Sequence, residues 1–170
     1  MQEIIKEFTV QPSDFDESSV NAYLPPRELV KELAKGKALA VYEQVDKDAV
    51  VIGSDTVVAL GNTVLGKPKT EDEARAMLTA LSGKPHAVYT GVCVVTCGKI
   101  QTRASKTEVY FNELTPAFID EYIRSGSPMD KAGAYGIQDG GLVKKIRGSY
   151  TGVVGLPVEL MRKMLQGVTE

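Results

Sequence analysis

The stretch VIGSDTVVAL, residues 51–60, constrains this chain most, because it places a carboxylate inside an apolar run. Both ends of the stretch are apolar and carry valine or isoleucine, which is typical of a buried strand. Ser54, Asp55 and Thr56 interrupt that run. Burying a carboxylate costs several kcal/mol unless a partner compensates for the lost water. We therefore predict a central strand over residues 48–60 and a partner for Asp55.

Helical and strand patterns alternate only in part along the rest of the chain. Apolar spacing, cap residues and glycine stops predict helices over 25–44, 70–83, 115–126 and 156–167. Alternating or continuous apolar runs predict strands over 3–10, 86–97, 103–111, 142–146 and 149–155. The runs 86–97 and 103–111 are expected to pair. This order favours an α/β protein with a mixed sheet flanked by helices over a doubly wound fold.

Length and charge restrict the function. The chain has 170 residues, which is typical of one domain, so we expect a single domain over 1–170. The net charge is −2 and the pI is about 5.6, without a lysine or arginine block, so no nucleic-acid partner is expected. No apolar run approaches the roughly 18 residues of a membrane span, and the charged start lacks a signal-peptide core. The prediction is a soluble, cytoplasmic protein without a membrane partner.

The thiols and the single histidine do not suggest a metal or covalent centre. Cys93 and Cys97 have a Cys-x3-Cys spacing that, with only His86 elsewhere, is a poor zinc pattern. They are expected to be small buried hydrophobic residues in a reducing compartment. His86 has no partner at the spacing of a catalytic triad, so covalent hydrolysis is disfavoured.

Four charged residues are candidates for chemistry on phosphates. Asp55 can ligate Mg²⁺ or accept a proton from water, or it can simply cap the turn after its strand. Lys37 lies on the apolar stripe of the predicted first helix, although a snorkelling lysine would give the same pattern. Lys67 follows in a Gly-Lys-Pro turn and can be only a solvated lysine. Glu17 is a second candidate metal ligand, and the choice between it and the two aspartates of its loop stays open.

The glycine-rich stretch MDKAGAYGIQDGG, residues 129–141, is the densest candidate for a binding loop. Its glycines permit close approach of backbone to a ligand. Lys131 offers a positive charge, and Gln138 offers both a donor and an acceptor, which suits the edge of a pyrimidine base. An ordinary turn-rich loop has the same composition. Together these residues suit metal-assisted chemistry on a phosphate ester without naming the substrate.

Several motifs together resemble the Maf family of nucleotide pyrophosphatases. They occur in family order along nearly the whole chain, as PSDFDE, LAKGKALAV, VIGSDTVV, LGKP, LSGKPHAVYTGV, KTEVYF, PMDKAGAYGIQ and VVGLP. The resemblance implies a fold like the inosine-triphosphate pyrophosphatases, a divalent cation such as Mg²⁺ or Mn²⁺, and a homodimer. It also implies hydrolysis of a nucleoside triphosphate to the monophosphate and pyrophosphate.

The resemblance further implies roles for individual residues. The residue matching Asp55 is the proton acceptor, and those matching Glu17, Lys37 and Lys67 surround the phosphates and the metal. The residues matching Thr56 and Gln138 help to select the base. The pairing of Asp55-Thr56 with AYGIQ is similar to the subfamily that acts on dTTP and UTP, and related members suggest action on modified pyrimidine nucleotides.

One departure from the family pattern concerns the start of the chain. Family members open with a strand and a Ser-x-Ser-Pro-Arg-Arg-like loop before a helix, and this chain does not contain that motif. We therefore expect a domain that is N-terminally truncated relative to the family, with lower stability and weakened activity. The alternative function is a non-catalytic nucleotide-binding regulator of cell division or septum formation.

Overall fold

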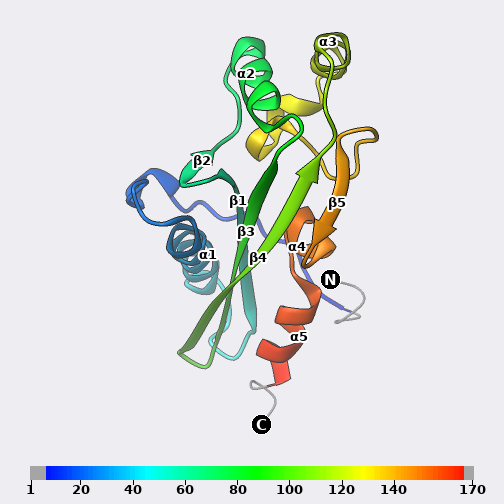
Figure 1. The fold of residues 1–170 in the computed structure, drawn as a ribbon. Helices are drawn as coiled ribbons and strands as arrows, with labels where there is room; N and C mark the ends of the chain where they lie inside the picture. The colour runs from blue at the N-terminus through cyan, green and yellow to red at the C-terminus, as the bar shows by residue number, and fades with distance from the viewer. Residues whose placement is uncertain (1–6, 167–170) are drawn as a thin grey trace.

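A five-stranded sheet organises the computed structural model, which describes residues 7–166 (Figure 1). The strands lie in the order β2-β1-β3-β4-β5, and each of the four neighbouring pairs is antiparallel. The strands are β1 (Val51–Leu60), β2 (Thr63–Leu65), β3 (Pro85–Thr96), β4 (Lys99–Phe111) and β5 (Val143–Arg147). The predicted α/β architecture with flanking helices is confirmed.

The long hairpin of β3 and β4 forms the middle of the sheet. The predicted pairing of these strands is confirmed, and its register runs from Pro85 opposite Tyr110 to Thr96 opposite Lys99. Only Cys97 and Gly98 connect the two strands, and both have positive φ, at 45° and 73°. Two-residue turns of this kind match the right-handed twist of the strands they join.

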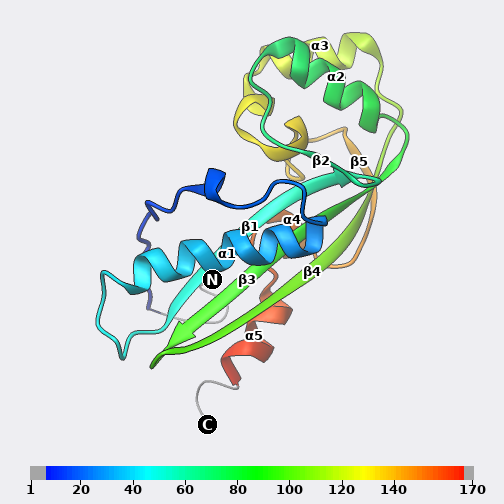
Figure 2. The ribbon, with the colours of Figure 1, turned by 90° about the vertical axis from the view of Figure 1, so that its left-hand side faces the viewer.

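Helices cover both faces of the sheet (Figures 1 and 2). On one face, α1 (Pro26–Tyr42) lies along β1 and β3, while α4 (Tyr150–Val154) and α5 (Val158–Gln166) cover the other face. The approach of α1 is close: a side chain added at Gly53 of β1 would stand 2.5 Å from the carbonyl oxygen of Ala34. Glycine at this position therefore lets the helix pack directly on the strand.

The helices α2 (Glu71–Leu81) and α3 (Pro116–Arg124) gather at one end of the sheet, with the short 3₁₀ turns η2 (Ser127–Asp130) and η3 (Ala132–Ala134) beneath them. Both helices begin as predicted. The Thr70 hydroxyl accepts the amide of Glu73, and the Thr115 hydroxyl accepts the amide of Phe118. Such caps satisfy amides that have no partner within the helix.

Four expectations differ from the structure. Cys93 is buried as expected, but Cys97 is exposed, because it lies in the turn between β3 and β4. Most of the strand predicted over 149–155 is helix α4 (Tyr150–Val154), because the Ser149 hydroxyl accepts the amide of Gly152 and caps a helical turn. Residues 7–10 are not in a strand, and residues 1–6 of the predicted first strand lie outside the described residues. Within residues 7–166 the sheet is antiparallel and not mixed.

No helix within residues 7–166 is long and apolar enough to cross a membrane.

Candidate functional site

Asp55 meets Lys37, which answers the question raised by the central strand. Lys37 extends from α1 to the carboxylate of Asp55 on β1, and the same ammonium lies 2.8 Å from Oε1 of Glu17. The side chain of Asp55 is 12% exposed, whereas that of Glu17 is 58% exposed. The three residues form a charged cluster, Glu17–Lys37–Asp55, that is buried on its strand side and open on the side of Glu17.

The segment before α1 packs against the helix at Gly36, where the absence of a side chain leaves room for it. The ring of Phe15 packs against Gly36, and a Cβ at that position would collide with the ring. The 3₁₀ turn η1 (Glu17–Ser19) follows, and the Asp16 carboxylate caps it by accepting the amide of Ser18. Glu17 is therefore the acid of this loop that faces Lys37.

The charges in the cluster are coupled. Burial raises the pKa of Asp55, and the Glu17 carboxylate acts in the same direction, although Lys37 and then Lys67 act against it. Burial lowers the pKa of Lys37, but the hydrogen bonds and charges of Asp55 and Glu17 outweigh it, and the net shift is upward. A carboxylate with a raised pKa beside a firmly protonated lysine is a suitable general base.

A separate pocket of about 270 Å³ lies on the other face of β1. Thr56, Lys67, Lys131 and Gln138 all line it, so the structure brings these four sequence candidates together. The remaining lining is mostly apolar and consists of Val58, Val88, Ala132, Tyr135, Gly136, Ile137, Val153 and Val154. Apolar walls with a few polar groups are typical of sites for small molecules.

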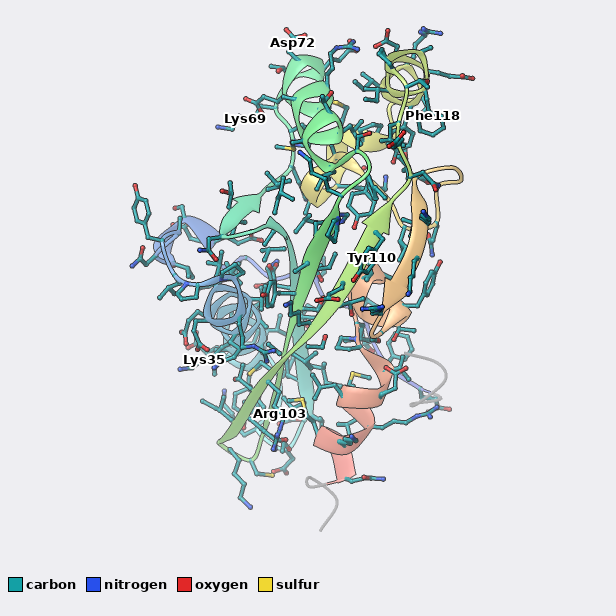
Figure 3. All side chains as sticks on the ribbon, in the orientation of Figure 1. Lys35, Lys69, Asp72, Arg103, Tyr110 and Phe118 are labelled. Atoms are coloured by element: carbon teal, nitrogen blue, oxygen red, sulfur yellow. The ribbon has the colours of Figure 1, made fainter. Side chains whose placement is uncertain are left out.

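The cluster and the pocket adjoin across one strand. Asp55 and Thr56 are consecutive, and side chains alternate between the faces of a sheet, so the two point to opposite sides of β1. Lys67 lines the pocket and also acts on the charge of Asp55. Lys69, two positions further on, projects from the outer surface near the start of α2 (Figure 3) and contributes to neither site.

Hydrogen bonds hold the glycine-rich loop against the pocket. The amide of Gly133 donates to the carbonyl of Gly66, which joins the loop of Lys131 to the loop of Lys67. Lys131 itself donates to the backbone oxygen of Ser127 at 2.7 Å. Glycine suits position 133, since φ is 69° and a side chain there would meet Val58.

Two buried polar residues bind side chains of the pocket lining, and the sequence did not predict either contact. His86, 4% exposed, lies with Nε2 at 2.7 Å from the hydroxyl of Tyr135, and that tyrosine lines the pocket. Thr90, 1% exposed, forms a hydrogen bond with Thr56. The only signal for Thr90 was a hydroxyl within an apolar strand, and its importance depends on a strand register that the sequence does not reveal.

The acids of the cluster suit a metal site completed by substrate. No group of three or more histidine, cysteine or acidic side chains within the described part of the chain gathers in a way that could hold a metal ion. Glu17 and Asp55 converge on one ammonium and provide two carboxylates. Mg²⁺ is commonly bound by one or two carboxylates together with substrate phosphates, so this donor set fits a divalent cation that arrives with a nucleotide.

The sequence is similar to those of known proteins along nearly its whole length. The family model described as Maf-like protein matches residues 1–168. A dTTP/UTP pyrophosphatase of Thermococcus kodakarensis is 50% identical over 96% of this chain and 87% of its own length. Proteins of the same name from Clostridium perfringens strain SM101 and Bacillus cereus strain G9842 are 43% and 48% identical, over 98% and 88% of this chain and 88% and 80% of their own lengths. On this match and these identities, the chain belongs to the Maf-like protein family.

Proposed function

We propose that this chain is a nucleotide pyrophosphatase that hydrolyses dTTP and UTP to the monophosphate and pyrophosphate. The relatives named for this activity support the reaction and the substrates. The observation that carries the proposal is the position of the Glu17–Lys37–Asp55 cluster directly across β1 from a pocket lined by two lysines and two polar side chains. Lys67 connects the two, because it lines the pocket and its charge also acts on Asp55, so phosphates bound by Lys67 would lie next to the base.

In the proposed reaction, a water molecule attacks the α-phosphorus. The new bond joins the water oxygen to that phosphorus, and the bond from the phosphorus to the oxygen bridging the α- and β-phosphates breaks. Pyrophosphate leaves with the electron pair, and Asp55 takes the proton of the attacking water. Lys37 keeps the carboxylate in place, since it binds Asp55 and Glu17 together.

Charge neutralisation is the second part of the proposal. Lys67 and Lys131 line the pocket and would hold the phosphates. Glu17 and Asp55 would hold Mg²⁺ or Mn²⁺, which supplies further positive charge on the phosphate oxygens. Positioning and neutralisation of this kind provide most of the catalysis in phosphoryl transfer.

Recognition of the base falls to Thr56 and Gln138. Both line the pocket among apolar side chains that suit the faces of a planar ring. The proposal extends to modified pyrimidine nucleotides, because these keep the pairing edge that such groups would contact.

We also propose a homodimer in the cytoplasm, as one domain without a nucleic-acid or membrane partner. The family resemblance supports the dimer, and the acidic pI argues against binding to nucleic acid. Cys93 and Cys97 are free thiols, which suits a reducing compartment. Light scattering after gel filtration tests the dimer, and a single cooperative unfolding transition tests the domain count.

The deciding experiment is pyrophosphate release from dTTP, UTP, CTP, GTP and 7-methyl-GTP with Mg²⁺ or Mn²⁺. Release from dTTP and UTP that Asp55→Asn abolishes is the expected result. Binding of these nucleotides without release would contradict the enzyme and favour the binding-only regulator. Lys69→Met is the matched control, because it removes a lysine of the same loop that lies outside the pocket.

A further inference from the structure

Two threonine hydroxyls and a backbone carbonyl form a chain of hydrogen bonds that begins at the pocket, and the hydrogen of each hydroxyl can be assigned to one partner. Thr56 and Thr90 lie directly opposite each other on β1 and β3, and their Oγ1 atoms are 2.9 Å apart. Thr90 Oγ1 is also 2.6 Å from the backbone oxygen of Gly152 in α4. Either threonine could donate in the first contact if the two were considered alone.

The carbonyl of Gly152 decides the direction. A carbonyl oxygen only accepts, so Thr90 must donate its single hydroxyl hydrogen to Gly152. Thr90 is 1% exposed, and water therefore does not compete for that hydrogen. With this hydrogen committed, Thr90 can only accept from Thr56, and Thr56 must donate its own hydrogen to Thr90.

We infer that Thr90 is a specificity-determining positioning residue, which commits the Thr56 hydroxyl as an acceptor toward the pocket. Only lone pairs of Thr56 remain for a ligand, so a ligand must donate to it. Where Thr56 faces N3 of the base, uracil and thymine present an N3–H donor, whereas cytosine presents an acceptor there and carries its donor on the 4-amino group instead. The inference deepens the proposed function and rests on it, since it assumes that a pyrimidine enters this pocket.

Gln138 cannot fix this choice by itself. Its amide carries both a donor and an acceptor, and rotation of the amide by 180° exchanges them. The Thr56–Thr90–Gly152 chain has no such freedom, because it ends on a backbone carbonyl. The carbonyl of Gly152 is held in place because α4 is fixed at both ends. Ser149 caps its start, and Ser54 donates to the carbonyl of Gly155 at its end, at 2.6 Å.

The test compares UTP with CTP in Thr90→Val. Valine has nearly the same shape as threonine but cannot accept from Thr56, so the Thr56 hydrogen becomes free to turn toward the pocket and donate to cytosine N3. The ratio of kcat/KM for UTP to that for CTP is expected to fall by about tenfold or more. A site that hydrogen-bonds a substrate donor rejects a ligand lacking that donor only while its own hydroxyl is fixed as an acceptor. Thr90→Ser keeps the hydroxyl and is expected to restore the ratio to within about twofold of the parent.

Thr107→Val is the matched control. Thr107 is also a 1% exposed threonine, on the neighbouring strand β4, and donates to the backbone oxygen of Ser149 next to α4. Its loss removes the hydrogen bonds that Thr107 makes with the oxygen and the amide of Ser149, and it leaves the contact between Thr56 and Thr90 in place. Thr90→Val is expected to fold, because the Gly152 carbonyl still accepts the amide of Gly155 at 3.1 Å and is not left without a partner. The melting temperature of the variant checks this.

Binding separates this inference from the proposed function. Calorimetric titration of UTP and CTP into Asp55→Asn, with and without Thr90→Val, measures selectivity without turnover. If the parent released no pyrophosphate but Thr90→Val still changed the binding ratio, the reaction would be wrong and the role of Thr90 correct. The inference is overturned if Asp55→Asn binds UTP and CTP equally, if Thr90→Val keeps the parent ratio, or if Thr107→Val changes the ratio as much.

Discussion

The hydroxyl of Tyr135 lies 2.7 Å from Nε2 of His86, behind the wall of the pocket. The rings of these two residues and of Phe111 meet edge to face, with centroids 4.7 to 5.4 Å apart. The contact connects the end of the sheet to the glycine-rich loop. It also makes the stability of the protein depend on the charge of its one histidine.

Stability is expected to fall as pH decreases below 6.5. Burial lowers the pKa of His86 from 6.5 to about 4. Between these values the unfolded chain binds a proton that the folded chain does not, so the free energy of unfolding rises with pH. The expected loss on going from pH 7.5 to 5 is about 2 kcal/mol, because a tenfold change in proton affinity corresponds to about 1.4 kcal/mol.

Urea unfolding of the parent and of His86→Gln across this range measures the effect. The variant lacks the titrating ring, and its unfolding free energy should vary less with pH by about the amount predicted for His86. Equal pH profiles for the two proteins would show that His86 is not responsible.

Gly36→Ala is expected to destabilise the protein, although alanine is the better helix former by about 1 kcal/mol. The added Cβ collides with the ring of Phe15. Displacing the ring should cost about 1–3 kcal/mol and move Glu17 away from Lys37. Pyrophosphate release should fall together with stability.

A double-mutant cycle with Phe15→Ala isolates this contact. Once the ring is removed, Gly36→Ala should become neutral or stabilising. A Gly36→Ala effect that is the same with and without Phe15 would show that the ring does not cause it.

Asp55→Asn is expected to abolish turnover and to stabilise the fold. Because burial raises the pKa of Asp55, the folded state disfavours the ionised carboxylate, which costs stability above the folded pKa. A neutral isostere removes this cost. The increase is expected to be up to about 2 kcal/mol, within the range of single stabilising substitutions.

Thermal unfolding at pH 7.5 and at low pH tests the sign for Asp55→Asn. The stabilisation should be present at neutral pH and disappear once the parent carboxyl is protonated. A lower melting temperature for the variant at neutral pH would mean that the ion pair with Lys37 outweighs burial.

Cys97→Asn should stabilise the protein by about 0.5–1 kcal/mol without changing pyrophosphate release. Cys97 has φ of 45°, a conformation that asparagine adopts more readily than other residues with side chains. The substitution makes an Asn-Gly turn between β3 and β4, the preferred sequence for this geometry. Urea unfolding measures the gain, with Cys97→Val, which disfavours positive φ, as the opposite control.

Local patterns identified most of the fold in advance. The paired strands β3 and β4 and the caps at Thr70 and Thr115 depend on residues close in sequence, and each was predicted. Thr151, Val153 and Val154 favour extended structure, yet the strand predicted over 149–155 does not form. The short helix forms instead because Ser149 caps it and Ser54 and Thr90 bind its carbonyl groups from the sheet.

The candidate site was predictable as a set of residues but not as an arrangement. Apolar surroundings singled out Asp55 and Lys37, yet their mutual contact depends on how α1 crosses β1. The role of Thr90 needs the register of β1 against β3 and the position of Gly152, 62 residues away. These are long-range relationships, and no local pattern in the chain encodes them.

The alternation of Asp55 and Thr56 along β1 has a consequence for how new specificities can arise. Adjacent codons specify the proposed catalytic base and the proposed base-reading hydroxyl, yet their direct partners differ, since Asp55 binds Lys37 and Thr56 binds Thr90. Replacing one leaves the neighbours of the other in place, so substrate preference can diverge while the chemistry is retained. Inserting or deleting one residue in β1 would exchange the two faces and abolish both, so the length of this strand should tolerate less change than its composition.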